Sequence, residues 1–287
     1  MIKFGNGLEM DFASASGALA WYGEGWWWEK PLRWAGFIRP DELTIISKTL
    51  TFEPRKGNLK WWCPWRCVRL AKGGAVNAVG LTNPGYEWWV KNFPAKIRER
   101  KIIASIMPGS KEEAEKMVKA INPCPIFGME INVSCPNVDH DASISHIKDI
   151  VDVVKANSKH PVILKLGYHD PYLDICKDLD GKVDAFDLIN TISWDKLYTE
   201  PSPLKKYNLV GGVSGPPIRE FSKEALVRVK ASGVKTPVIS GGGVDSIQEV
   251  FARFLGGAGA VTFGTLFLRE PWKPAQIIKE FHEGWHV

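Results

Sequence analysis

The sequence predicts an α/β fold of the (β/α)8 or TIM-barrel class, with long βα loop insertions over the C-terminal face. Short apolar runs rich in β-branched residues alternate with amphipathic stretches, which is the pattern of repeated βα units. Eight such runs fit into 287 residues, and this favours a closed barrel over an open doubly wound sheet. We expect one domain over residues 1–287, with its chemistry at the C-terminal ends of the strands.

The candidate strands and helices follow from hydrophobic spacing. SKEEAEKMVKAI (110–121) places Ser110 as a helix N-cap with Glu113 three residues on, as in a capping box. ASISHIKDIVDVVKAN (142–157) repeats apolar residues at spacings of three and four, which predicts a second helix. The strands are MDFASAS (10–16), LTIISK (43–48), KIIASI (101–106), FGMEINVS (127–134), PVILKLG (161–167), AFDLINT (185–191), TPVISGG (236–242) and AGAVTFG (258–264).

Two regions, residues 50–100 and 193–222, interrupt the alternation, and both follow a candidate strand. We expect both to be long βα loops over the C-terminal face, where lids and substrate clamps are usually built. Much of the total of 13 tryptophans lies in WYGEGWWWEK (21–30) and WWCPWRC (61–67). We expect these rings to pack irregular loops onto the barrel, although exposed aromatic clusters can also mark partner surfaces or stacking platforms.

Composition and charge exclude several classes of protein. No run of about 18 apolar residues appears, and the N-terminus MIKFGNGLEMDF lacks the order of a signal peptide. We therefore expect a cytoplasmic protein without a membrane partner. The net charge of +5 suits a phosphate-bearing cofactor or an anionic substrate, but no stripe of Lys and Arg predicts nucleic-acid binding.

The five cysteines indicate reduced thiols, because an odd number in a long chain argues against a disulfide framework. At least one thiol is then free for chemistry. Cys63 and Cys67 are spaced like half of a metal or iron–sulfur site, but such a site needs about four ligands and no second close Cys or His pair is visible. We expect no metal.

Polar residues stand at the ends of several candidate strands. They are Lys48, Asn132, Ser134, Lys165, Asn190 and Thr191. Any one of them could be a satisfied core residue. Together, at the C-terminal rim of a barrel, they would converge on a pocket with positive charge and neutral hydrogen-bonding groups. Such a pocket suits a flat anionic heterocycle that bears a carboxylate and ring amides.

Two glycine turns predict a phosphate site. SGGGV (240–244) follows the seventh candidate strand and leads into a helix, and FGTLF (263–267) follows the eighth. These glycines could simply make tight turns, but the loops after strands seven and eight of a TIM barrel commonly hold a phosphate. With Lys165 available to stabilise a reduced, negatively charged ring, flavin mononucleotide (FMN) is a natural ligand.

These motifs resemble the class 1 dihydroorotate dehydrogenases, which are FMN-binding (β/α)8 barrels. The resemblance covers nearly the whole chain and keeps order and spacing. Each motif is short, but the set is specific. One departure is Ser105, which stands where the family usually has an asparagine that contacts the flavin. The motifs are ASASG (13–17), SKT (47–49), NAVGLTNPG (77–85), NVSCPN (132–137), LKLG (164–167), INT (189–191), GGVSGPPI (211–218), SGGGV (240–244) and FGT (263–265).

The resemblance implies roles for individual residues. Cys135 would be the general base that takes a proton from C5 of dihydroorotate while hydride leaves C6 for N5 of FMN; a thiol pKa of about 8.5 suits that role. The substrate-binding positions would be Lys48, Asn77, Ala78, Val79, Gly80, Leu81, Asn132, Asn137, Asn190 and Thr191. The FMN-binding positions would be Ser16, Gly17, Lys48, Thr49, Ser105, Asn132, Lys165, Ile189, Gly215, Gly242, Gly243, Gly264 and Thr265.

The resemblance also implies partners, and it leaves the electron acceptor open. Class 1 enzymes either reduce fumarate as homodimers or pass electrons to NAD through a separate iron–sulfur and FAD subunit. GLTNPG (80–85) and GGVSGPPI (211–218) look closer to the second group, but the chain has neither a dinucleotide fingerprint nor a cluster-binding cysteine set. We expect a homodimeric barrel core, with a possible iron–sulfur/FAD partner subunit.

Three other functions stay open. A different FMN barrel, of the dihydropyrimidine or dihydrouridine type, could reduce a pyrimidine ring or an RNA uridine, with its cysteine as an acid. An RNA enzyme should show a basic groove, and a pyrimidine reductase would not need a carboxylate-binding lysine such as Lys48. The chain could also be a non-catalytic barrel that binds a phosphate ligand. Finally, the tryptophan clusters alone would fit a structural or interaction protein.

Overall fold

Eight parallel strands form a closed barrel in the computed structural model, which describes residues 1–93, 100–134 and 143–284. The neighbouring order is β4-β3-β15-β14-β11-β10-β9-β8, and pairing of β4 with β8 closes the ring. All eight predicted barrel strands and the TIM-barrel class are thereby confirmed. The strands are β3 (Phe12–Ser14), β4 (Thr44–Ile46), β8 (Ile102–Met107), β9 (Gly128–Asn132), β10 (Val162–Leu166), β11 (Ala185–Leu188), β14 (Val238–Ser240) and β15 (Ala260–Phe263).

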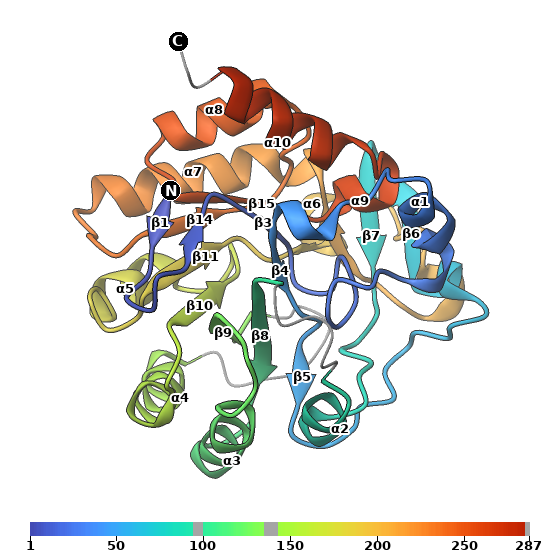
Figure 1. Cartoon of the computed structure of the whole chain (residues 1–287). Coiled ribbons are helices and arrows are strands. Elements are labelled where there is room, and N and C mark those ends of the chain that lie inside the picture. The colour runs from blue at the N-terminus through green and yellow to red at the C-terminus, as the bar shows by residue number, and fades with distance from the viewer. Residues whose placement is uncertain (94–99, 135–142, 285–287) are drawn as a thin grey trace.

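Helices surround the barrel on its outside (Figure 1). The predicted capping of the helix after β8 is confirmed, because the Ser110 side chain accepts a hydrogen bond from the Glu113 amide. Ser143 and Ser246 cap α4 and α8 in the same way, each accepting a hydrogen bond from the backbone amide three residues on. The helices are α1 (Lys30–Trp34), α2 (Tyr86–Lys91), α3 (Lys111–Ile121), α4 (Ile144–Asn157), α5 (Tyr172–Asp178), α6 (Trp194–Leu197), α7 (Arg219–Ala231), α8 (Ile247–Leu255), α9 (Thr265–Arg269) and α10 (Lys273–Gly284).

The alternation of side chains along each strand builds two cores. In β10, Val162, Leu164 and Leu166 pack toward the helices, whereas Ile163 belongs to the barrel interior. The interior cluster also contains Ile2, Phe4, Leu8 and Met10 from the N-terminal hairpin of β1 (Ile2–Lys3) and β2 (Glu9–Met10). This hairpin closes the N-terminal end of the barrel with apolar side chains, so the opposite end is left for polar residues.

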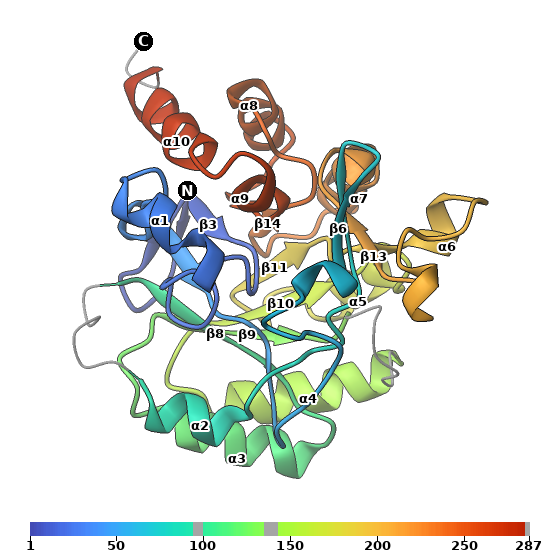
Figure 2. The ribbon, with the colours of Figure 1, turned by 90° about the vertical axis from the view of Figure 1, so that its right-hand side faces the viewer.

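The two predicted loop insertions lie over the C-terminal face but are not irregular throughout. They pair with each other in an antiparallel sheet of order β12-β13-β7-β6. Two of its strands, β6 and β13, are labelled beside the barrel in Figure 2. Lys72 and Gly73, with φ of +53° and +76°, make the tight turn between β6 and β7. The strands are β6 (Val68–Ala71), β7 (Gly74–Asn77), β12 (Ile192–Ser193) and β13 (Gly212–Ser214), while β5 (Leu50–Thr51) extends the barrel sheet beside β8.

Candidate active site

A cavity of about 300 Å³ lies between the C-terminal ends of the barrel strands and the sheet of β6, β7 and β13. Because parallel strands end at the same rim, residues far apart in the sequence meet in its wall. Eighteen of the residues singled out from the sequence line it. They are Ser16, Gly17, Lys48, Thr49, Asn77, Val79, Gly80, Leu81, Asn132, Lys165, Ile189, Asn190, Thr191, Gly215, Gly242, Gly243, Gly264 and Thr265.

The remaining predicted residues lie elsewhere. Ala78 is buried but does not contribute to the cavity wall. Ser105 is fully buried beneath the floor, where its hydroxyl contacts Thr49 and Glu130. Cys135 and Asn137 lie outside the described residues. The structure therefore brings together both halves of the predicted site, the strand-end amides and the glycine turns.

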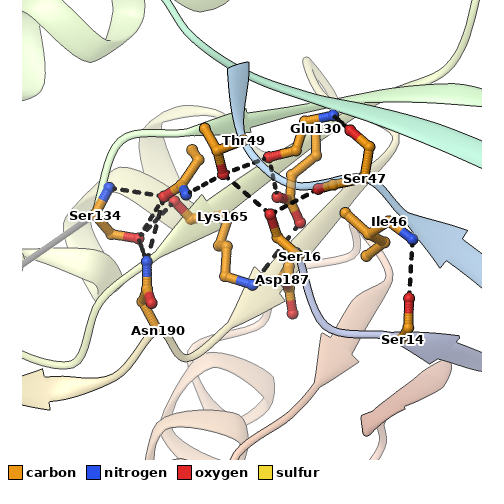
Figure 3. Close-up of polar contacts among 12 residues, drawn as sticks. Ser14, Ser16, Ile46, Ser47, Thr49, Glu130, Ser134, Lys165, Asp187 and Asn190 are labelled. Carbon is orange, nitrogen blue, oxygen red and sulfur yellow. Dashed lines mark hydrogen bonds and ion pairs between the residues drawn. The ribbon is translucent and has the colours of Figure 1, made fainter. Parts of the chain in front are cut away.

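A hydrogen-bond network fixes the amides at the floor of the cavity (Figure 3). Asn132 Nδ2 donates to Thr49 Oγ1 at 2.9 Å, and Asn190 Nδ2 donates to Asn132 Oδ1 at 3.3 Å. Asn190 Nδ2 also lies 3.2 Å from the Ser134 hydroxyl. These bonds set which end of each carboxamide is the oxygen, so the floor presents oriented donors and acceptors to a ligand.

A buried ionic cluster lies at the same level of the barrel. Lys165 Nζ lies 2.8 Å from Asp187 Oδ2 and 3.9 Å from Glu130 Oε2, and all three side chains are buried. The three residues occupy neighbouring strands, and the alternation of β9, β10 and β11 turns each side chain into the barrel. One ammonium group thus faces two carboxyl groups in a medium of low polarity.

Glu130 is the less well compensated of the two carboxyl groups. Its Oε1 accepts a hydrogen bond from Ser105 Oγ at 2.7 Å, but Oε2 has no hydrogen-bond partner among the described residues. Complete burial, reinforced by the charge of Asp187 and opposed by Lys165, raises the pKa of Glu130 to about 7. A proton on Glu130 leaves Lys165 and Asp187 as a neutral pair beneath the cavity.

The glycine turns have the geometry of an anion site. Gly215, Gly242 and Gly243 have φ of +84°, +83° and +84°, a region that disfavours side chains. A Cβ on Gly243 would lie 2.7 Å from Arg219 Cβ. Within the described part of the chain, no acceptor binds the backbone N–H groups of Gly242 and Gly243. These donors line the cavity and are therefore available to an anionic ligand group.

Arg253 supports this turn and was missed from the sequence. Its side chain is fully buried in α8, where Nη1 donates to Ser222 Oγ and Ser240 Oγ at 2.6 and 3.0 Å, and Nη2 donates to the carbonyl oxygen of Gly242 at 2.9 Å. Burial lowers the pKa of Arg253 to about 10, so the guanidinium stays charged at neutral pH. The sequence feature that could have revealed this role is a single arginine within the otherwise apolar segment VFARFL (250–255).

Six tryptophans of the segments 21–30 and 61–67 fall into two groups. Trp26 and Trp28 stack at 5.4 Å and line the cavity, and Trp26 Nε1 donates to the Gly17 carbonyl. The expectation that the rings pack loops onto the barrel is wrong for a second group of four exposed rings. Trp27, Trp61, Trp62 and Trp65 are 51%, 69%, 59% and 55% exposed. The last three lie in a surface turn around a 3-10 helix, Pro64–Arg66, and largely face solvent.

The four cysteines in the described part of the chain lie outside the cavity and do not form a metal site. Cys63, Cys67, Cys124 and Cys176 are free, and burial raises the pKa of Cys67 to about 11. Among residues 1–93, 100–134 and 143–284, no cluster of three or more His, Cys, Asp and Glu side chains could hold a metal ion. In the same residues, no helix has the length and apolar character needed to cross a lipid bilayer.

Fold and cavity together define the class: a TIM barrel whose C-terminal face carries glycine turns beside an amide-lined, lysine-bearing floor. Residues 38–284 match the family of dihydroorotate dehydrogenases. The chain therefore belongs to the dihydroorotate dehydrogenase family, whose members are flavoproteins that oxidise dihydroorotate in pyrimidine biosynthesis.

Individual relatives agree with the resemblance to class 1. The catalytic subunit of dihydroorotate dehydrogenase B (NAD(+)) from Thermoanaerobacter pseudethanolicus is 32% identical over 244 residues, which are 82% of this chain and 79% of that protein. The subunit of the same name from Lachnoclostridium phytofermentans is 29% identical, covering 88% and 85%. A protein of Aeropyrum pernix classed as a dihydroorotate dehydrogenase A (fumarate) is 31% identical, covering 78% and 74%.

A solved structure supports the fold alone. The dihydroorotate dehydrogenase of Eimeria tenella, in a complex with ferulenol, superposes with a TM-score of 0.74 at 18% identity. The superposition covers 97% of this chain and 82% of the Eimeria chain. The two chains therefore share the same fold, although their sequences have diverged widely.

Proposed function

We propose that this chain is an FMN-dependent class 1 dihydroorotate dehydrogenase that converts dihydroorotate to orotate with Cys135 as the general base. The observation that carries the proposal is the single cavity in which glycine turns, Lys165 and a fixed carboxamide floor meet. A phosphate-bearing flavin and an anionic pyrimidine need those three features in one place.

The residues around the cavity fit FMN. The glycine turns at Gly215, Gly242, Gly243 and Gly264 would hold the phosphate, with Arg253 keeping the second turn in shape. When bound, FMN supplies the hydride acceptor of the reaction. Lys165 would place positive charge beside the ring, and Thr49 and Asn132 would bond its polar edge. Ser105 would act through Thr49, since it does not reach the cavity wall.

The dihydroorotate site would combine charge with amides. Lys48 would bind the carboxylate, and Asn77, Asn132, Asn190 and Thr191 line the cavity where the pyrimidine ring would bond. The segment from Ala78 to Leu81 would complete the wall. In the sequence, Cys135 comes three residues after the end of β9 at Asn132, and Asn137 comes two residues later. The chain would therefore deliver the thiol and a third amide to the same rim.

We further propose that a partner subunit with iron–sulfur and FAD groups takes the electrons, and that the barrel forms a homodimer in the cytoplasm. The names of the type B relatives, which describe a catalytic subunit of an NAD-dependent enzyme, support the partner. Fumarate remains the alternative acceptor because of the type A relative. Efficient fumarate-dependent turnover by the chain alone would contradict the partner.

The cofactor and the base can be tested together. We expect the purified chain to release one FMN per chain on denaturation, identified by mass. A Cys135→Ala variant should keep FMN but lose flavin reduction by dihydroorotate by a factor of at least about 100, since a positioned base typically contributes that much or more. Unchanged reduction in this variant would remove Cys135 from the mechanism, and release of a different flavin would refute FMN.

A further inference from the structure

The exposed tryptophans form a continuous surface with the mouth of the cavity. Trp27 lies between the cavity-lining residues Trp26 and Trp28, and its indole N–H donates to the carbonyl oxygen of Trp61 at 2.9 Å. Trp61 and Trp62 contact edge to face at 5.6 Å. The turn that carries them, 60–67, lies between the cavity-lining residues Leu59 and Val68. We call this surface the tryptophan rim; it comprises Trp27, Trp61, Trp62, Trp65 and Tyr207 with their neighbouring cations.

The tryptophan rim is strongly cationic. Residues 54–86 contain six Lys and Arg and no Asp or Glu. Lys60 lies over the ring of Trp62, and Arg66, Arg69 and Lys206 lie within 5.1–5.8 Å of the ring centre of Tyr207.

These four cations have no carboxylate of the described residues within 4.0 Å, whereas Lys72 at the edge of the same sheet pairs with Glu200 at 2.7 Å. Lys60, Arg66, Arg69 and Lys206 can therefore meet carboxylates from outside the chain.

Exposed aromatic rings surrounded by cations are typical of a binding surface, because each ring buries a large area and each cation adds charge complementarity.

Electrons must also leave the cavity through a short path. Dihydroorotate loses two electrons and two protons as it becomes orotate; the protons go to solvent, and a protein acceptor with a one-electron centre takes the electrons in two steps. The tryptophan rim is the face beside the cavity at which such an acceptor can approach.

We propose that the tryptophan rim is the docking face for the electron-accepting partner, which must present an apolar centre surrounded by Asp and Glu. This proposal rests on the proposed function for the source of the electrons and for the use of a protein as their acceptor. An anionic bilayer would also meet aromatic rings and cations, but it would not itself accept electrons. We therefore assign the surface to an acidic redox protein and treat the bilayer as a competing outcome.

Three variants separate the possibilities. Lys60→Glu/Arg66→Glu/Lys206→Glu reverses the charge of the rim. Trp61→Ser/Trp62→Ser/Trp65→Ser removes its apolar surface. Lys159→Glu/Lys182→Glu/Lys235→Glu makes the same change in net charge with three exposed lysines that precede β10, β11 and β14, at the opposite end of the barrel.

The probe is oxidised rubredoxin, a small acidic one-electron carrier, mixed with the FMN-loaded, photoreduced enzyme. We expect flavin reoxidation to slow at least 10-fold in each rim variant, and in wild type when ionic strength rises from 20 to 200 mM. The opposite-end variant should retain most of the wild-type rate. Binding of fluorescently labelled rubredoxin, followed by anisotropy, should weaken in parallel. Reoxidation by menadione, a small neutral quinone, should not change in any variant.

Two results would overturn the proposal. One is equal slowing by the rim and opposite-end charge reversals, which would mean that only net charge matters. The other is loss of binding to phosphatidylglycerol vesicles in the rim variants while their rubredoxin rates stay unchanged, which would make the rim a membrane contact. Photoreduction keeps this test separate from the proposed function, because failure of dihydroorotate to reduce the flavin would leave the docking measurement intact.

Discussion

At the scale of single residues, the alternation of two neighbouring strands explains where the charge lies. Ile163 and Ala185 fill the apolar interior, and two residues further along the same strands Lys165 and Asp187 face each other. Adding Glu130 from β9 gives the cluster one more carboxyl group than it has ammonium groups. Burial of an unpaired charge is costly, so the protonation of Glu130 is coupled to folding.

This coupling predicts a pH dependence of stability. The pKa of Glu130 is about 7 in the folded chain and 4.5 when exposed, so the folded state holds more protons between these values. The contribution of Glu130 is fully present below pH 4.5 and is lost as pH rises through 7, by at most about 3 kcal/mol. Glu130→Gln should therefore flatten the fall in unfolding free energy between pH 5 and 8, measured by urea unfolding.

The matched control is Glu280→Gln, which changes an exposed carboxyl group of α10. We expect this variant to keep the wild-type slope. A Glu130→Gln slope identical to wild type would show that the buried carboxyl does not carry the proton that its surroundings favour.

At the scale of elements, α8 and the turn before it act as one unit. Arg253 reaches from the helix to the carbonyl oxygen of Gly242, so its loss should disturb the phosphate site without touching the ring site. Arg253→Met should weaken FMN binding about 10- to 100-fold, because charge-assisted hydrogen bonds of this kind contribute a few kcal/mol. Riboflavin, which lacks the phosphate, should bind wild type and variant alike, and an equal loss for both ligands would contradict the assignment.

The same unit depends on backbone conformation. Gly243 and Gly181 both have positive φ, but a Cβ at Gly243 would meet Arg219 at 2.7 Å while one at Gly181 has no atom within 4 Å. Gly181→Ala should cost about 1 kcal/mol from its φ alone, whereas Gly243→Ala should cost about 2–4 kcal/mol through added crowding. Urea unfolding of the two variants at saturating FMN measures the difference, and equal costs would contradict it.

The barrel strands and the phosphate turns could be predicted from the sequence because both depend on local signals. Apolar runs with β-branched residues mark each strand, and SGGGV or FGT marks each turn. The antiparallel sheet of β6, β7, β12 and β13 could not be predicted, since its strands are short and the pairing that joins the two insertions, between β13 and β7, brings together Gly212 and Asn77, which are 135 residues apart. Arg253 was missed for a related reason: its partners Ser222 and Ser240 are distant in sequence.

At the scale of the whole molecule, one end of the barrel provides stability and the other provides the site. Leu8 of the N-terminal hairpin is 2% exposed and packs into the interior cluster. Leu8→Ala should lower the unfolding free energy by about 2–5 kcal/mol and leave FMN affinity unchanged at temperatures where the chain is folded. Leu255→Ala, at a side chain that is 89% exposed, should change stability by about 0.5 kcal/mol or less.

This division also explains why the function could be approached from the sequence. The interior residues that separate the two ends are apolar. Lys48, Asn132 and Lys165 are instead polar and buried, and Asn190 is polar and half-buried, although burial of polar groups costs free energy. Their meeting in one cavity required the closed barrel, which brings strands two, four, five and six together. The exposure of Trp61 and Trp62 could not be predicted, because it depends on what packs above the turn.

An anaerobic titration of the purified, FMN-loaded protein with dihydroorotate tests the central claim most directly. We predict loss of the visible absorbance of the oxidised flavin, with one orotate formed for each flavin reduced. Persistence of the oxidised spectrum at millimolar dihydroorotate, in a preparation that dithionite does reduce, would contradict the assignment of this barrel as a dihydroorotate dehydrogenase.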